Sequence, residues 1–285
     1  MPNINWFPGH MAKARNQVQE KLKQVDLVLE IVDARIPEAS RNPMMNQIVG
    51  QKPRIMVLNK QDLADPQATA RWLRYYQDQG FAALAIDAQH AKRLNQISAL
   101  ARKLMAAKLE KQKARGIRNP SLRAMCIGIP NVGKSTVLNR LVKKNIAVVG
   151  NRPGVTKNQQ WLKVDDSLAL LDTPGILWPK FDDQLIGQKL ALTGAIADSV
   201  FQEDTVGLYG LDFFQTHYPQ ALRRAYQLTA DDMALSAPDL MVVLAKKLGF
   251  GDNYNRAAER VIFDARQGKF GPFTLEVPDD DAEGL

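Results

Sequence analysis

An eight-residue stretch from Gly128 to Ser135 constrains the fold of this chain more than any other segment. It reads Gly-Ile-Pro-Asn-Val-Gly-Lys-Ser and fits the Gly-x-x-x-x-Gly-Lys-Ser/Thr pattern of loops that join a strand to a helix and cradle phosphates. Residues 122–127 before it are mostly apolar and strand-like, and residues 136–144 after it have helical periodicity. The sequence therefore predicts a phosphate-binding loop in an α/β fold.

The parts of this loop have distinct expected roles. Backbone N–H groups and the N-terminus of the following helix would hold the phosphates, Lys134 would bridge the β- and γ-phosphates, and Ser135 would bind Mg²⁺. We also expect Lys134 to be catalytic. The nucleotide-binding residues expected in this segment are Asn131, Val132, Gly133, Lys134, Ser135 and Thr136.

A second nucleotide-binding motif, Asn59-Lys60-Gln61-Asp62, lies far upstream of this loop and directly follows the apolar run 55–58. At the end of a strand, Asp62 can accept hydrogen bonds from the N1 and N2 donors of guanine, which adenine does not offer. A buried carboxylate left unpaired by the wrong base is costly, so this contact would give specificity.

Three neighbouring residues complete the expected base site. Asn59 would tie this loop to the phosphate loop, and the aliphatic stem of Lys60 would pack on the plane of the base. The strand-like run 82–86 ends at Asp87-Ala88-Gln89, where the backbone N–H of Ala88 would meet the guanine carbonyl.

The γ-phosphate sensors of a GTPase are expected after the phosphate loop. Thr156 ends the segment Arg-Pro-Gly-Val-Thr, and Asp172-Thr173-Pro174-Gly175 follows a strand-like run. Asp172 would hold Mg²⁺ through water, Thr156 would also bind it, and the N–H of Gly175 would contact the γ-phosphate. Thr156 and Gly175 are therefore catalytic candidates as well. The motifs occur in a circularly permuted order, with base recognition first, then the phosphate loop and then the γ-phosphate sensors. A parallel sheet tolerates this order because its contacts survive a change of termini.

These motifs together make the chain resemble a known family, the circularly permuted GTPases of the ribosome biogenesis GTPase A (YlqF) type. The resemblance covers the whole GTPase half and continues beyond it. The segments that carry it are Trp6 to Met11, Asp33-Ala34-Arg35-Ile36-Pro37, Gly128 to Thr136, Asp172 to Ile176 and Leu192 to Ile196.

The resemblance implies GTP hydrolysis coupled to late maturation of the large ribosomal subunit, with the precursor particle and GTP or GDP as partners. Ile176 stands where many GTPases have a water-orienting glutamine, and an apolar side chain cannot orient water. The family suggests His10 as the catalytic alternative, although a lone histidine near a chain end is also typical of a surface residue.

Asn131 has two readings. The resemblance implies that it can hold K⁺ beside the phosphates, where the cation would supply the charge of an arginine finger. Alternatively, Asn131 only caps the loop.

Charge supports a polyanionic partner only loosely, with a formal net charge of +8 and a pI near 9.5. Residues 102–123 contain eight basic side chains and a single acidic one, Glu110. Such a run is as typical of a solvated helix face as of a surface that lies along rRNA phosphates.

The expected architecture is α/β. Residues 1–178 would form a circularly permuted GTPase domain, a mostly parallel sheet with helices on both faces. Residues 179–285 would form a small all-helical domain that contacts RNA, with an acidic tail. The main helices are expected at residues 12–25, 67–79, 94–113, 185–197, 219–228, 239–248 and 255–266.

The remaining sequence features favour a cytoplasmic monomer. The single cysteine, Cys126, excludes an intrachain disulfide, and no apolar stretch reaches the length of a membrane span. Other functions stay open at this point: a nucleotide-gated RNA-binding switch acting on the small subunit or on tRNA. Asp62 argues against an ATP-dependent kinase.

Overall fold

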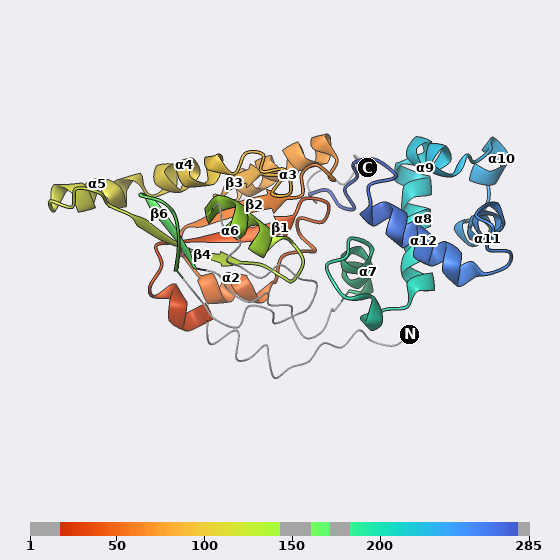
Figure 1. Cartoon of the computed structure of the whole chain (residues 1–285), viewed down its shortest axis with the longest axis horizontal. Helices are drawn as coiled ribbons and strands as arrows, with labels where there is room; N and C mark the ends of the chain where they lie inside the picture. Colours follow the sequence, from red (N-terminus) through yellow and green to blue (C-terminus); the bar gives the residue numbers. More distant parts are fainter. Residues whose placement is uncertain (1–17, 143–160, 172–182, 279–285) are drawn as a thin grey trace.

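Six strands form one central sheet in the order β3-β2-β1-β4-β6-β5 (Figure 1). The computed structural model describes residues 18–142, 161–171 and 183–278. The strands are β1 (Leu27–Asp33), β2 (Arg54–Asn59), β3 (Ala82–Ala85), β4 (Leu122–Ile127), β5 (Trp161–Asp165) and β6 (Leu168–Leu171). All neighbouring pairs are parallel except β5 with β6, the antiparallel hairpin at the edge. The mostly parallel α/β sheet expected from the sequence is therefore confirmed.

Strands β1 and β2 are buried along their whole length because helices cover both faces of the sheet. Leu29 and Ile31 of β1 point to one side, where they join the hydrophobic cluster of α4 and α6. Val28 and Val32 point to the other side, toward the helix at residues 18–22, α2 and α3. Cys126 is buried in this sheet, as expected.

The helices of the first half are α2 (Met44–Val49), α3 (Pro66–Asp78), α4 (Asn95–Leu104), α5 (Ala106–Ala114) and α6 (Lys134–Val142). The expected long helix over residues 94–113 is interrupted at Met105, whose φ of −103° ends α4. In Figure 1, α5 projects past the end of the sheet. Local propensity favours helix on both sides of Met105, so the break was not predictable from composition.

The second half is helical, as expected. Its elements are α7 (Gln184–Leu192), η1 (Asp198–Val200), α8 (Glu203–His217), α9 (Pro219–Tyr226), α10 (Ala230–Met233), α11 (Ala237–Lys247) and α12 (Tyr254–Arg266). The sequence did not single out α8, the longest of these. It packs against α12 through Gly207, where an added Cβ would lie 2.6 Å from the Cα of Ala258.

After α12 the chain runs back to the sheet-containing half. We call residues Phe273–Glu276 the strap. The strap is buried, and its backbone N–H groups donate to Leu63 O at 3.0 Å and Arg35 O at 2.8 Å. The expected domain boundary between residues 178 and 179 therefore divides the sequence, but the strap from the second part packs against the first part.

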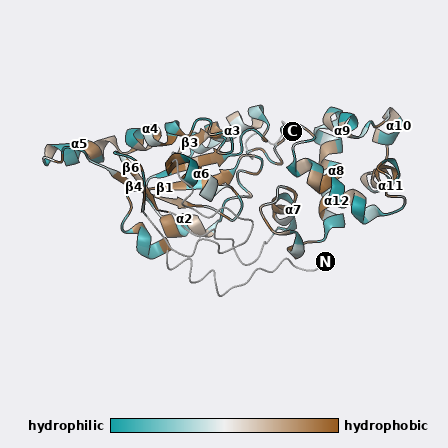
Figure 2. Ribbon diagram, viewed as in Figure 1, coloured by the Kyte–Doolittle hydropathy of each residue, from teal (hydrophilic) through white to brown (hydrophobic). Residues whose placement is uncertain are grey.

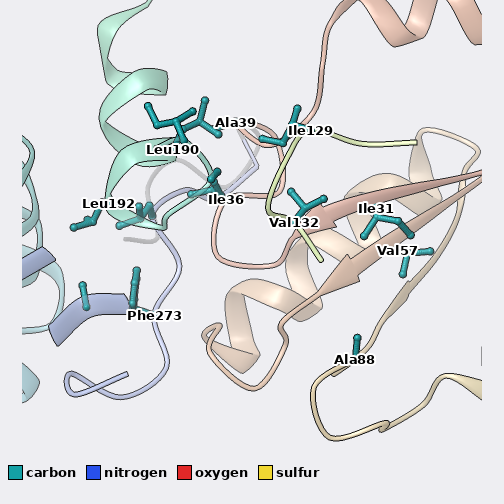
Figure 3. Packing of buried hydrophobic residues seen from close by; sticks show 14 of the residues in the cluster. Ile31, Ile36, Ala39, Val57, Ala88, Ile129, Val132, Leu190, Leu192 and Phe273 are labelled. Carbon is teal, nitrogen blue, oxygen red and sulfur yellow. The ribbon is translucent and has the colours of Figure 1, made fainter. Parts of the chain in front are cut away.

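One hydrophobic cluster runs through both halves (Figure 3). Leu190 of α7 lies beside Ile36, Ala39 and Ile129 of the first half, and Phe273 of the strap belongs to the same cluster. Packing of this kind stabilises a fixed arrangement of the two halves.

Apolar residues concentrate on the strands and on inner helix faces, while outer helix surfaces are mixed or hydrophilic (Figure 2). No helix among the described residues has both the length and the apolar character of a membrane span.

We expect Gly207→Ala to destabilise the fold by about 2 kcal/mol, because the new methyl group overpacks the crossing of α8 with α12. Urea unfolding measures this change, and Asp212→Ala, at an exposed position of the same helix, is the control. Equal stability of the two variants would mean that the crossing adjusts without cost.

Candidate nucleotide-binding site

Two motifs separated by about seventy residues of sequence meet at one edge of the sheet. The base-recognition motif begins at the carboxyl end of β2, and the phosphate loop follows the carboxyl end of β4. Both strands are parallel to β1, with Asp33 in register with Asn59 and Glu30 with Ile127. Because carboxyl ends of parallel strands share an edge, β1 brings the two motifs together.

The side chain of Asn59 bridges the two motifs. Its Nδ2 donates to Val132 O at 2.9 Å, and its Oδ1 accepts from the N–H of Ala88 at 3.1 Å. The tie between the base loop and the phosphate loop expected from the sequence is present in the structure. The N–H of Ala88 is engaged by Asn59 here, so its contact with the guanine carbonyl stays a prediction.

Gly133 makes room for this bridge. Its φ is +94°, and a Cβ at this position would lie 2.3 Å from the Nδ2 of Asn59. A side chain would therefore displace the amide that joins the two loops, in a backbone conformation that favours glycine.

The phosphate loop leads directly into α6, whose first residues are Lys134, Ser135 and Thr136. Lys134 is buried, and its ammonium donates to Ile129 O within the same loop at 2.7 Å. The ammonium is therefore held at the loop, at the N-terminal end of a helix where anions are favoured.

Lys60 adopts a left-handed backbone conformation, with φ of +62°, and its ammonium lies 2.8 Å from the Oδ2 of Asp33. Asp33 is fully buried and also forms two hydrogen bonds with the guanidinium of Arg35, at 3.0 and 2.8 Å. In this arrangement Lys60 is anchored by a carboxylate from β1. Packing of its stem on the base stays a prediction.

The acidity of Asp33 follows from this cluster of charges. Burial alone would raise the pKa of its carboxyl, but the charges of Arg35 and Lys60 outweigh burial and hold that pKa well below its usual value. Asp33 is therefore a carboxylate in the folded protein, and its single negative charge offsets part of the charge of the two cations beside it.

The side chain of Asp62 is partly exposed, as is required of a carboxylate that meets a ligand. His90 lies beside it, with Nδ1 at 3.9 Å from the Oδ2 of Asp62 and at 2.8 Å from the Oδ2 of buried Asp87. The N–H of His90 also donates to Asp87. His90 belongs to no motif and is expected from the sequence to be structural, and only the fold places it next to Asp62.

The phosphate loop also contacts the helical half. Asn131, with φ of +60°, donates from Nδ2 to Ala195 O at 3.4 Å. Its amide oxygen is then the atom that would bind K⁺, since a hard cation takes oxygen ligands. This bond reaches the helical half and is not the loop cap that was the second expectation for Asn131, and binding of K⁺ stays a prediction.

Four expected site residues lie outside the described residues, namely His10, Thr156, Asp172 and Gly175. Their roles stay predictions. The expected Mg²⁺ ligands Ser135, Thr156 and Asp172 are hydroxyls and a carboxylate, a donor set that suits this ion. Of these three, Ser135 is described, and it stands at the start of α6 beside the phosphate loop.

Two residues at this edge, Arg35 and Glu276, form long-range hydrogen bonds that the sequence does not predict. Arg35 donates to Thr193 O at 2.8 Å, which joins the first half to the end of α7. The buried carboxylate of Glu276 accepts from the N–H groups of Glu38 and Ala39 and faces Lys189 at 3.1 Å. Burial raises the pKa of Glu276, although these partners act in the opposite direction.

Comparison with known proteins gives close relatives over the whole chain. A family model described as 50S ribosome-binding GTPase matches residues 123–209. Ribosome biogenesis GTPase A of Priestia megaterium is 49% identical over 288 residues, covering 99% of each chain. A protein of Mycoplasma pneumoniae described as probable ribosome biogenesis GTPase A is 34% identical, covering 96% of each chain.

Solved structures share the fold. YlqF from T. maritima, solved with GNP bound, has a TM-score of 0.63 and 23% identity, and the match covers 94% of this chain and 99% of that one. A GDP-bound YlqF structure gives a TM-score of 0.64.

We expect Asn59→Asp to weaken nucleotide binding at least about tenfold, because a carboxylate oxygen would replace the N–H donor that faces Val132 O. Titration with a fluorescent guanine nucleotide measures the dissociation constant. Asn253→Asp, at the N-cap of α12 where aspartate caps equally well, is the matched control. Unchanged affinity in Asn59→Asp would show that the bridge is dispensable for binding.

We expect Asp33→Asn to cost about 3 kcal/mol at neutral pH, because it leaves buried Arg35 uncompensated. The pKa of Asp33 is lowered in the folded state, so its stabilising contribution is complete above the unfolded pKa of about 4 and declines as pH falls below it. Urea unfolding from pH 7 to pH 3 should show the gap between wild type and variant narrowing in acid.

The control for this pH series is Asp183→Asn, which preserves the N-cap of α7. It should stay within about 0.5 kcal/mol of wild type. A gap for Asp33→Asn that stays constant down to pH 3 would contradict the assignment.

Proposed function

The chain belongs to the ribosome biogenesis GTPase A family, and we propose that it uses GTP binding and hydrolysis to drive late assembly of the large ribosomal subunit. GTPase activity follows from membership of this family. The choice of the large subunit and stimulation of hydrolysis by the precursor particle are the further steps of the proposal.

The observation that carries the nucleotide part is the bridge made by Asn59 between the two loops. It fixes the distance from the carboxylate expected to recognise the base to the phosphate loop, and a rigid span of this kind favours a ligand of the size of a purine nucleotide. Asp62 would select guanine, and Lys134 with the backbone N–H groups from Asn131 to Thr136 would hold the phosphates.

Hydrolysis would depend on charge stabilisation and on an oriented water molecule. Lys134 would offset the charge that develops on the transferring phosphoryl group, and Gly175 and Thr156 would contact the γ-phosphate. His10 would orient the attacking water, because Ile176 has no polar atom for that role.

Bound Mg²⁺ would neutralise charge on the β- and γ-phosphates. Ser135, Thr156 and Asp172 would hold this ion, the last through water. Asn131 would bind K⁺ through its amide oxygen and keep its N–H group for Ala195.

An exposed basic surface supports a ribosomal partner. We call the segment from Arg102 to Arg123 the basic arm. Its exposed cations are Arg102, Lys103, Lys111, Lys113, Arg115, Arg118 and Arg123. Lys113 is paired with Glu110, the one acid of the segment, and Arg123 lies 5.2 Å over the ring of exposed Trp161. Cations next to an exposed aromatic ring suit RNA, through phosphate contacts and base stacking.

The description of the matching family model, a 50S ribosome-binding GTPase, favours the large subunit over the small subunit or tRNA. Those two remain the alternative partners. In each case the protein would act as a nucleotide-dependent switch on RNA, and the alternatives differ only in which particle or RNA it binds.

We expect Lys111→Glu with Arg115→Glu to lower binding to large-subunit particles at least about tenfold at moderate salt, because two phosphate contacts become repulsive. Co-sedimentation with purified subunits, in a GTP analogue, in GDP and without nucleotide, measures binding. Wild type should bind the large subunit most tightly with the analogue, and its GTPase rate should rise on those particles.

The matched control is Arg74→Glu with Arg224→Glu, which reverses two exposed charges outside the basic arm. Equal losses in both double variants would mean that net charge, and not this surface, determines binding. Sedimentation of wild type with the small subunit, or with neither subunit, would overturn the proposed partner and leave the GTPase assignment intact.

A further inference from the structure

The carboxylate expected to recognise guanine sits in a short loop that is held at both ends. On one side of Asp62, the N–H of Gln61 donates to Ile86 O at 3.1 Å, which fixes the loop to the strand end of β3. On the other side, Leu63 O accepts from the N–H of Phe273 at 3.0 Å. The first anchor comes from the sheet, and the second comes from the strap.

A second hydrogen bond joins the strap to this loop. The N–H of Asp65 donates to the Oγ1 of Thr274 at 3.1 Å, and the side chain of Asp65 caps the N-terminus of α3. Thr274 is fully buried. The segment from Leu63 to Asp65 is thus fixed by two hydrogen bonds whose partners lie more than two hundred residues later in the chain.

The strap is itself held firmly by both halves of the molecule. The helical half contributes Tyr218, whose Oη accepts from Thr274 N–H at 3.1 Å, and Phe214, whose ring lies 4.9 Å from that of Phe273. On the sheet side, Trp72 Nε1 donates to Glu276 O at 2.9 Å. The Glu276 carboxylate is buried against N–H groups and Lys189.

The strap is linked to Lys60, the other residue of the motif expected to touch the base, indirectly through Arg35 and Asp33. Leu275 donates to Arg35 O, and the guanidinium of Arg35 lies 5.8 Å over the ring of Phe273. Arg35 in turn fixes Asp33, the carboxylate that holds Lys60. The strap therefore fixes the loop of Asp62 by direct hydrogen bonds and restrains Lys60 indirectly.

We propose that Thr274 and its neighbours in the strap are positioning residues for guanine recognition, and that the strap sets how well the site distinguishes guanine from other purines. A carboxylate discriminates only when it is held in reach of both N1 and N2 of the base, so a loosened loop loses specificity before it loses all affinity. The inference rests on the role of Asp62 in the proposed function.

The test compares GDP with inosine diphosphate, which lacks the 2-amino group of guanine. Calorimetric titration of the full chain gives both dissociation constants, and the measured ratio is that of inosine diphosphate divided by that of GDP. Thr274→Val keeps the shape of the side chain and removes the oxygen that accepts from Asp65, and we expect it to lower this ratio about threefold to tenfold. Thr274→Ser retains the hydroxyl and should keep the wild-type ratio.

Two further variants separate specificity from stability. Ser236→Ala removes the N-cap of α11, away from the strap, and should lower stability with no change in the ratio. If Thr274→Val does not fold, Glu276→Gln replaces it, because the amide keeps an oxygen for the N–H groups and loses the charge that faces Lys189. A ratio that stays at the wild-type value in the strap variant, with or without an equal loss of affinity for both nucleotides, overturns the inference.

Asp62→Asn distinguishes this inference from the proposed function. If Asp62→Asn keeps the wild-type ratio, the proposed role of Asp62 fails, and the inference about the strap fails with it. If Asp62→Asn abolishes discrimination and the strap variant preserves it, only the inference about the strap fails.

Discussion

Parallel pairing of β1 with both β2 and β4 is the constraint on which the site depends. Register between Asp33 and Asn59, and between Glu30 and Ile127, aligns three strand ends at one edge. The amide of Asn59 then spans from one loop to the next with a donor and an acceptor in the required directions. Since register between strands does not depend on the order of strands in the chain, the circular permutation leaves this geometry unchanged.

A cluster of buried charges fixes the positions of side chains and main chain at the same edge of the sheet. Isolated, either Arg35 or Asp33 would be costly to bury, but Asp33 is paired with both Arg35 and Lys60 and offsets part of their charge. The guanidinium also donates to Thr193 O, so the cluster reaches the end of α7. An apolar cluster of equal size could pack at this position but would not orient Lys60 or hold the main chain at Thr193.

Sequence patterns predicted the strands, the helical second half and the phosphate loop because each has a local signal, such as the apolar run of β1 or the glycines around Lys134. The bridge by Asn59 was also predictable, because its motif implies a partner at the phosphate loop. Predictions for His10 and Thr156 stay untested, since both lie outside the described residues.

Other features had no local signal. Glycines at 207 and 210 lower the helix propensity of α8, which is stabilised by packing on α12. Nothing around Thr274 or Glu276 indicates a return to the sheet, because their partners are distant in sequence. Contacts between residues far apart in the chain are set by tertiary structure and are not legible from periodicity.

The bond between Asp65 and Thr274 also has a consequence for the newborn protein. The two residues are 209 positions apart, so at about 5–20 residues per second a translating ribosome makes the loop roughly 10–40 s before its partner. During that interval the loop that carries Asp62 lacks its two hydrogen bonds to the strap. If the strap positions Asp62 as proposed, a nascent chain that binds nucleotide in this interval would distinguish guanine less well than the finished protein, and full selectivity would be acquired last.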